Sequence, residues 1–315
     1  MNRRNFVKNT AASVTGMMLS VGAGTGCVAA QAGNSAAISG TQKKYDVMKE
    51  ALKYRKLDSH AHAHLGIDVT AKDFEFMNRF NIERSYVSNP LSAGKYDPEQ
   101  FRRHNDLVYS AMQKYPGRMI GMFTLNPFYQ KESLDEIQRN VDRGMVGLKL
   151  YYQYKINDPL FNPIIEKMIG LKMITLMHAE ATLGTGGYRM KYDKKRMPNT
   201  SVPEDFVDMA KRYPEAMLQY AHIGGGPDWE YACKALKHSP NVYVDTSGSN
   251  NEEYMIDFAI KELGVDRLLY ATDLSNSYFQ GVGKILCSNT TEEQKRKIFF
   301  DNYNNVLRKS GNHVH

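Results

Sequence analysis

Cysteine is scarce in this chain, with three residues among 315. Only Cys233 and Cys287 lie in the body of the sequence, so the protein is not a small domain held together by disulfides and must rely on a hydrophobic core. About 280 residues remain after the N-terminal leader described below, a length that suits one large α/β domain better than two small ones.

Surplus positive charge and long apolar runs are lacking too. The formal net charge is +7, but Arg3, Arg4 and Lys8 lie near the N-terminus, which leaves about +4 for the rest. An excess of this size does not predict binding to nucleic acid or to an anionic membrane surface. The N-terminal stretch 11–24 is weakly apolar and too short to cross a bilayer, so we expect no membrane span.

Acidic residues are absent from the first 45 positions. Arg3-Arg4 precedes the weakly apolar stretch 11–24, and this combination resembles a twin-arginine export signal. We therefore predict a signal segment over 1–32 and a periplasmic protein. The competing interpretation is a cytoplasmic tail that happens to contain two adjacent arginines.

Two ways of processing this segment compete. Ala30-Gln31-Ala32 matches a cleavage site for release of a soluble protein. Gly24-Thr25-Gly26-Cys27 resembles a lipobox, which would anchor the protein through a lipid on Cys27. A lipobox prefers a larger apolar residue where Gly24 stands, so we favour release.

Apolar runs of strand length alternate with amphipathic runs of helix length over the body, as in a parallel α/β sheet. Eight runs are typical of buried strands: 56–59, 84–87, 119–125, 146–150, 173–177, 217–221, 242–245 and 268–272. Helices are predicted over 70–80, 98–115, 131–142, 160–171, 203–213, 228–238 and 252–263. A last helix is expected to be capped by Thr291, with Gln294 completing a capping box.

Eight strand–helix units in one chain predict a (β/α)8 TIM barrel that forms a single domain. The predicted organisation is a signal segment over 1–32, a linker with a lead-in helix over 33–53, the barrel over 54–309 and a tail over 310–315. In such a barrel the carboxyl ends of the strands meet on one face, where barrel enzymes carry their catalytic groups.

Histidine or aspartate stands at the end of four of these runs. The residues are His60, His62, His178, His222 and Asp273. Alternate residues of a strand point the same way, so His60 and His62 can hold one ion together, with His62 and His64 as the alternative pair. Imidazole and carboxylate are ligands for zinc and similar divalent ions. One such histidine alone would be read as structural, but the four strand ends together predict a metal centre.

The residues also predict roles in chemistry. A bound divalent cation lowers the pKa of water from 15.7 to about 7, which makes hydroxide available at neutral pH. Asp273 can take the proton of that water if it lies within hydrogen-bonding reach. His222 can polarise a carbonyl or pass a proton to a leaving group. The glycines 224–226 either let the backbone approach the site closely or simply form a tight turn.

Several segments in the same order resemble the amidohydrolase superfamily, in the branch that contains aminocarboxymuconate-semialdehyde decarboxylase. They are Leu-Asp-Ser-His-Ala-His at 57–62, then 115–127, 144–150, His178, 221–226, 271–273 and 301–307. The resemblance covers about residues 56 to 307. It implies a barrel enzyme with one divalent metal, for which we expect zinc, with manganese as the alternative. The ligands that it implies are His60, His62, His178 and Asp273, with His222 as the acid/base residue or as a further ligand.

Substrate contacts are expected from the segments that follow the strands. Lys149 ends the fourth run, and in some relatives a lysine there is carbamylated and bridges two metals; we prefer a charge in the pocket floor. Tyr151 and Tyr152 follow it and are expected to wall the pocket. Glu180 and Arg189 follow the fifth run, and the basic loop around Arg189 would attract a carboxylated substrate unless it is simply a solvated charge run.

The sequence thus predicts a metal-dependent hydrolase that uses a metal-activated water on an ester, lactone or amide bond of a small molecule. The alternative is a non-oxidative decarboxylase, because the named relative cleaves a C–C bond at the same kind of metal site. A barrel that binds metal or ligand without turnover is the third candidate, and the complete ligand set argues against it. Assembly into a homo-oligomer is left open.

The export prediction can be tested directly. Replacing Arg3 and Arg4 by lysine should hold the uncleaved precursor inside the cell, because the twin-arginine pair is the recognised signal. Mass spectrometry of the mature chain should find its N-terminus near Gly33. A mature chain that begins at a diacylated Cys27 would show anchoring instead of release, and an intact Met1 in native cells would contradict export.

Overall fold

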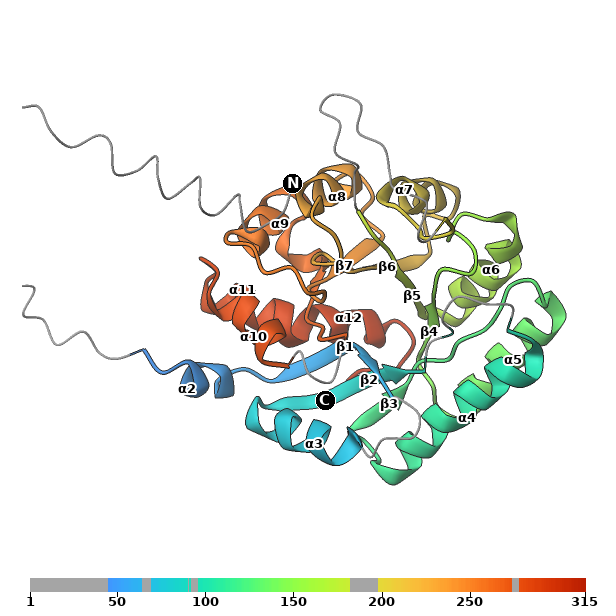
Figure 1. The fold of residues 1–315 in the computed structure, drawn as a ribbon, viewed down its shortest axis with the longest axis horizontal. Coiled ribbons are helices and arrows are strands. Elements are labelled where there is room, and N and C mark those ends of the chain that lie inside the picture. Colours follow the sequence, from blue (N-terminus) through green and yellow to red (C-terminus); the bar gives the residue numbers. More distant parts are fainter. Residues whose placement is uncertain (1–44, 64–68, 90, 92–95, 182–197, 274–277) are drawn as a thin grey trace, which may run out of the picture. The chain divides into compact units, whose positions relative to one another are not determined.

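Parallel strands alternate with helices along the chain, and the helices lie around the strands (Figure 1). The computed structural model describes residues 45–315 except 64–68, 90, 92–95, 182–197 and 274–277. The predicted signal segment 1–32, Cys27, most of the linker 33–53, His64 and Arg189 therefore lie outside the described residues. No helix in the part that is described has the length and apolar character needed to span a bilayer.

All eight predicted strands are present, in two parallel sheets. The first sheet has the order β1-β2-β3, formed by Lys56–His62, Ile82–Ser88 and Met119–Gly121. The second has the order β4-β5-β6-β7-β8, formed by Gly147–Leu150, Ile174–His178, Met217–Ala221, Val242–Asp245 and Leu268–Leu269. Because neighbouring strands are parallel, their carboxyl ends meet at the same edge of each sheet.

Backbone contacts join the two sheets at both of their edges. Beyond β3, Phe123 forms a parallel bridge with Leu148 of β4. Beyond β8, the carbonyl of Tyr270 accepts a hydrogen bond from the backbone N–H of Ser59 in β1, at 3.0 Å. The carboxyl ends of both sheets are therefore held close together.

The predicted helices are confirmed within a few residues. They are α2 (Val47–Leu52), α3 (Val69–Arg79), α4 (Pro98–Lys114), α5 (Gln130–Asp142), α6 (Asn162–Leu171), α7 (Pro203–Arg212), α8 (Trp229–Leu236), α9 (Met255–Leu263), α11 (Glu292–Arg296) and α12 (Asn302–Arg308). The predicted capping box is present: Thr291 Oγ1 accepts from Gln294 N at 3.1 Å, and Gln294 Oε1 accepts from Thr291 N at 2.9 Å. A π-helical turn over Lys297–Asp301 joins α11 to α12.

One helix, α10 (Tyr278–Leu286), was not predicted from the sequence. Gly281 and Gly283 fall within it, and glycine in a helix interior costs about 1 kcal/mol relative to alanine. Tertiary packing explains one of them: a Cβ atom on Gly281 would lie 3.1 Å from the carbonyl oxygen of Ala271. The helix therefore passes close to the backbone after β8, and local propensity alone does not reveal it.

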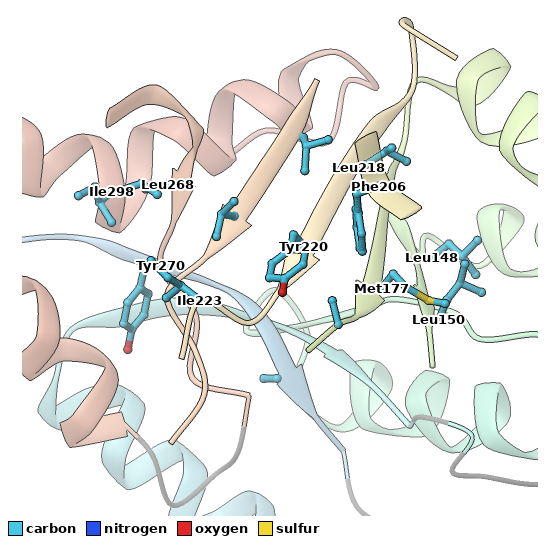
Figure 2. Close-up of a cluster of buried hydrophobic side chains, with 14 of the residues drawn as sticks. Leu148, Leu150, Met177, Phe206, Leu218, Tyr220, Ile223, Leu268, Tyr270 and Ile298 are labelled. Atoms are coloured by element: carbon cyan, nitrogen blue, oxygen red, sulfur yellow. The ribbon is translucent and has the colours of Figure 1, made fainter. Parts of the chain in front are cut away.

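The strands are packed on both faces. On the side of the helices, Phe206 of α7 lies against Tyr220 of β6 with ring centroids 5.0 Å apart (Figure 2). Leu148, Leu150 and Met177 belong to the same buried cluster. A second cluster includes Tyr86 of β2 and Tyr303 of α12, whose ring centroids are 4.7 Å apart. Side chains at the carboxyl ends are thus carried by a close-packed frame.

Candidate metal centre

His60 and His62 leave the end of β1 side by side and meet Asp273, which follows β8. Asp273 Oδ1 lies 3.1 Å from His60 Nε2 and 3.0 Å from His62 Nε2. Asp273 has a left-handed backbone with φ of 64°, which aspartate tolerates better than most residues, and its N–H donates to the carbonyl of His60 at 2.7 Å. The one potential ligand atom from each of these three side chains lies within 4.8 Å of the other two.

The second nitrogen of each of these histidines has its own partner. His60 Nδ1 lies 3.1 Å from Asp245 Oδ2, and His62 Nδ1 lies 3.1 Å from Ser88 Oγ. Metal-binding histidines usually donate their other ring N–H to a carboxylate or another oxygen, which orients the ring. Both Nε2 atoms are therefore left to face Asp273.

His178 and His222 lie beside this group. His222 Nε2 is 3.0 Å from His178 Nδ1, and the rings of His60 and His222 are stacked with centroids 5.2 Å apart. The potential ligand atoms of His60, His62 and Asp273 lie within 4.8 Å of one another, and His178 does not belong to that group. The structure thus brings all five predicted strand-end residues to one place, with His178 in contact through His222.

Asp245, at the end of β7, is a site residue that sequence reasoning missed. It is completely buried and forms a second compact group with His60 and His222. Its position at the end of the predicted run 242–245 is the same signal that selected Asp273. Burial would raise the pKa of this carboxyl, but the charge and hydrogen bond of His60 outweigh it and lower the pKa to about 2.

Lys149 and two tyrosines complete one side of the site. Lys149 is completely buried, and its Nζ lies 2.9 Å from His60 Nε2 and 5.2 Å from the centre of the Tyr151 ring. Tyr151 stacks on His178 at 4.8 Å, and Tyr152 meets the same ring edge-on at 5.5 Å. The predicted pocket floor and pocket wall are therefore in contact with the histidines.

Glu180 is placed less directly. Its backbone N–H donates to the carbonyl of Ser201 at 3.1 Å, two residues beyond His178. At Gly224, the second residue after His222, a Cβ atom would lie 2.9 Å from the carbonyl oxygen of Ser247. The turns after β6 and β7 are therefore in direct backbone contact.

Comparison of the sequence with models of protein families identifies the family of this chain. The model of the amidohydrolase family matches residues 58–304. The chain belongs to this family. No curated protein sequence matches it.

Known structures share the fold of this amidohydrolase. The 2,6-dihydroxybenzoate decarboxylase from Rhizobium is 18% identical with a TM-score of 0.64, over 82% of this chain and 100% of that chain. The 5-carboxyvanillate decarboxylase from Sphingomonas paucimobilis is 17% identical with a TM-score of 0.61, over 81% and 99%. A dihydroxybenzoic acid decarboxylase from Polaromonas, with bound manganese and 2-nitroresorcinol, is 18% identical with a TM-score of 0.63, over 81% and 97%.

The side chains of this amidohydrolase suit a divalent metal. Neutral imidazole is the form that binds metal, and burial lowers the pKa of His60 and lowers that of His178 well below its usual value. Burial also lowers the pKa of His222 to about 4. Although burial opposes it, the charges that His222 and His60 carry when protonated hold the pKa of Asp273 well below its usual value, so this carboxylate is ionised.

These shifts predict how the stability of the metal-free amidohydrolase depends on pH. The unfolded chain takes up protons at its histidines as pH falls below about 6.5, whereas folded His222 resists protonation until about 4. The free energy of unfolding, measured with denaturant in the presence of a chelator, should therefore fall from pH 6.5 to 4. His222→Gln should remove up to about 1 kcal/mol per pH unit of that fall. The exposed His238 provides the control variant His238→Gln, and equal pH slopes for both variants would contradict the assignment.

Proposed function

We propose that this amidohydrolase is a metal-dependent, non-oxidative decarboxylase of a small carboxylated substrate. The observation that carries the proposal is the buried ammonium of Lys149, which lies 2.9 Å from His60 Nε2. Within the described residues Lys149 forms no ion pair with a carboxylate. A buried ammonium in this position favours an anionic partner supplied by the substrate. In the metal-free protein burial lowers its pKa to about 8, against the charges of Asp273 and Asp245, which raise it, so the amine is charged in most molecules at neutral pH.

The rings around Lys149 support a planar substrate. Tyr151 and His178 are stacked, and Tyr151 and Tyr152 lie with centroids 4.5 Å apart. Aromatic side chains of this kind pack well against a further flat ring. The three relatives of similar fold described above are named as decarboxylases of aromatic carboxylates. We therefore propose an aromatic or similarly planar carboxylate as the substrate class.

The proposed metal ligands are His60, His62, His178 and Asp273. The structure of the decarboxylase from Polaromonas holds bound manganese, so we propose manganese or zinc as the ion. When bound, such an ion supplies a Lewis acid that stabilises negative charge developing on the substrate. His60 Nε2 would be the atom that holds such an ion, and Lys149, 2.9 Å from it, would be the cation next to the substrate carboxylate.

Residues of the chain bind the substrate, exclude water and transfer the proton. Lys149 binds and orients the carboxylate, and Tyr151 and Tyr152 keep water from that side. When the C–C bond breaks, its electron pair stays on the substrate carbon, carbon dioxide leaves, and one proton must be added to that carbon. His222 is neutral at neutral pH and passes this proton on at Nε2, since its Nδ1 is engaged by Ser247 Oγ at 2.7 Å. It takes the proton from solvent for each turnover, so the net reaction consumes one proton for each carboxylate.

Hydrolysis is the second candidate, and one observation favours it. Asp273 Oδ1 contacts both His60 and His62, which is where a proton acceptor for a bound water would stand. Under this alternative Asp273 takes the proton of the attacking water and His222 protonates the leaving group.

We also propose that the two sheets form one closed (β/α)8 barrel over 54–309. The bridge between Phe123 and Leu148 and the hydrogen bond between Ser59 and Tyr270 support closure. The organisation around it, with an export signal over 1–32, a lead-in over 33–53 and a tail over 310–315, belongs to the same proposal.

The metal site is tested by elemental analysis of purified protein. About one equivalent of manganese or zinc should be bound per chain, and His60→Ala and His178→Ala should lose it because each removes a ligand. His238→Ala, an exposed histidine, serves as the control and should keep its metal. If both His60→Ala and His178→Ala kept a full equivalent of metal, the proposed site would be refuted.

The reaction is tested with a panel of aromatic carboxylates, with carbon dioxide release as the readout. Turnover should release one carbon dioxide per product, and His222→Ala should lower kcat by about 10²–10⁴-fold while keeping most of its metal. Lys149→Met should mainly raise KM, since it removes the cation that binds the carboxylate. If no carboxylate released carbon dioxide and aromatic esters or lactones instead gave acids carrying ¹⁸O from labelled water, hydrolysis would be established and decarboxylation overturned.

A further inference from the structure

Asp245 is surrounded entirely by hydrogen-bond donors. Its Oδ2 faces His60 Nδ1 at 3.1 Å and Gln219 Nε2 at 3.0 Å. Its Oδ1 accepts from the backbone N–H of Ser247 at 3.1 Å and from Ser247 Oγ at 2.5 Å. The carboxylate is buried and accepts at both oxygens. Because it has no proton to donate, each neighbouring group must carry the proton of the hydrogen bond that it shares with Asp245.

The first of these hydrogen bonds joins Asp245 to His60. An ionised carboxylate has no proton to give, so His60 Nδ1 must carry the proton that it shares with Asp245. The lone pair of neutral His60 is then at Nε2, the atom 3.1 Å from Asp273 Oδ1.

A second series of hydrogen bonds joins Asp245 to Ser247 and Ser247 to His222. The single hydroxyl proton of Ser247 is donated to Asp245, so its oxygen can only accept from His222 Nδ1, at 2.7 Å. Neutral His222 therefore carries its proton at Nδ1 and its lone pair at Nε2. Any second proton must then add at Nε2, the atom that faces His178 at 3.0 Å.

We infer that Asp245 is a positioning residue that sets the tautomers of both His60 and His222, directly for the first and through Ser247 for the second. The roles of the two histidines rest on the proposed function, but the chain of hydrogen bonds does not. One buried carboxylate thereby aims the metal-binding atom of His60 and the proton-carrying atom of His222 into the same site.

Asp245 is not itself placed to bind the ion held by Asp273. His60 meets Asp245 through Nδ1 and Asp273 through Nε2, so the imidazole ring separates the two carboxylates. Both oxygens of Asp245 are already engaged by donors from three residues, whereas a metal ligand needs a lone pair directed at the ion.

The turn that carries Ser247 is held firmly. Lys284 Nζ donates to the carbonyls of Gly248 at 2.6 Å and Thr246 at 3.2 Å. Gly248 has a φ of 96°, and a Cβ atom there would lie 2.3 Å from the carbonyl carbon of Gly224. The turn that positions the hydroxyl is therefore packed against the turn that follows His222.

The experiment reads tautomers by NMR of ¹⁵N-histidine-labelled, metal-free protein, with signals assigned through His60→Gln and His222→Gln. In Asp245→Asn, the backbone N–H of Ser247 still requires an oxygen, so the amide nitrogen must face His60 Nδ1. We expect His60 to change from the Nδ1–H to the Nε2–H form, and Mn²⁺ affinity to fall by about 10–100-fold. Ser247→Ala should disturb the tautomer of His222 alone and leave that of His60 and the Mn²⁺ affinity unchanged.

Matched controls separate this role from loss of a buried polar group. Asp205→Asn alters another buried carboxylate, and Ser133→Ala removes another buried hydroxyl, both outside the site. Ser247→Thr keeps the hydroxyl and should restore the Nδ1–H form of His222. If Asp245→Asn fails to fold, the contrast between Ser247→Ala and Ser247→Thr still tests whether Ser247 sets the tautomer of His222.

The outcomes that would overturn the inference are distinct from failure of the proposed function. Unchanged tautomers in both Asp245→Asn and Ser247→Ala would refute the positioning role, whatever reaction the enzyme catalyses. A switch of His60 in Ser247→Ala would also refute it, because the two sets of hydrogen bonds would not be separate. Absence of carbon dioxide release would instead count against decarboxylation alone, since the NMR experiment contains neither metal nor substrate.

Discussion

The imidazole of His60 lies between two carboxylates, and the rest of the site depends on this constraint. Asp245 meets its Nδ1 and Asp273 meets its Nε2, both at 3.1 Å. The ring is completely buried, so it cannot turn without breaking its hydrogen bond to Asp245 and leaving that buried carboxylate without one of its donors. His62 and His222 are arranged around this fixed ring, at centroid distances of 5.0 and 5.2 Å.

Burial and hydrogen bonding act in complementary ways on this site. Burial keeps His60, His178 and His222 neutral by lowering their pKa, which leaves lone pairs for an ion or a proton. Asp245 and Asp273 remain ionised because, although burial raises their pKa, hydrogen-bond donors and the charges that His60 and His222 carry when protonated lower it further. Lys149 is the exception, an ammonium whose partner within the described residues is an imidazole nitrogen. This asymmetry places neutral imidazoles, ionised carboxylates and one buried ammonium side by side.

Local pattern was sufficient for the frame and for most of the site. The eight apolar runs became eight strands, and the rule that strand ends carry chemistry selected His60, His62, His178, His222 and Asp273. The rule applied equally to Asp245, which was missed although it ends the run 242–245; its contact with His60 is made only in the fold, across 185 positions. Helix α10 was missed because its two glycines weaken the helical signal, while the backbone contact that requires Gly281 is made only in the fold.

The sequence by itself determined the strands and the histidines and aspartate that follow four of them, since periodicity and strand ends are local properties of the chain. Only the tertiary structure decided which nitrogen faces which oxygen. Asp245 and His60 are joined across 185 positions, and Asp273 reaches His62 across 211. Such contacts depend on the angle and register of parallel strands and on the turns after them, and no local pattern encodes these because they arise from packing of the whole sheet.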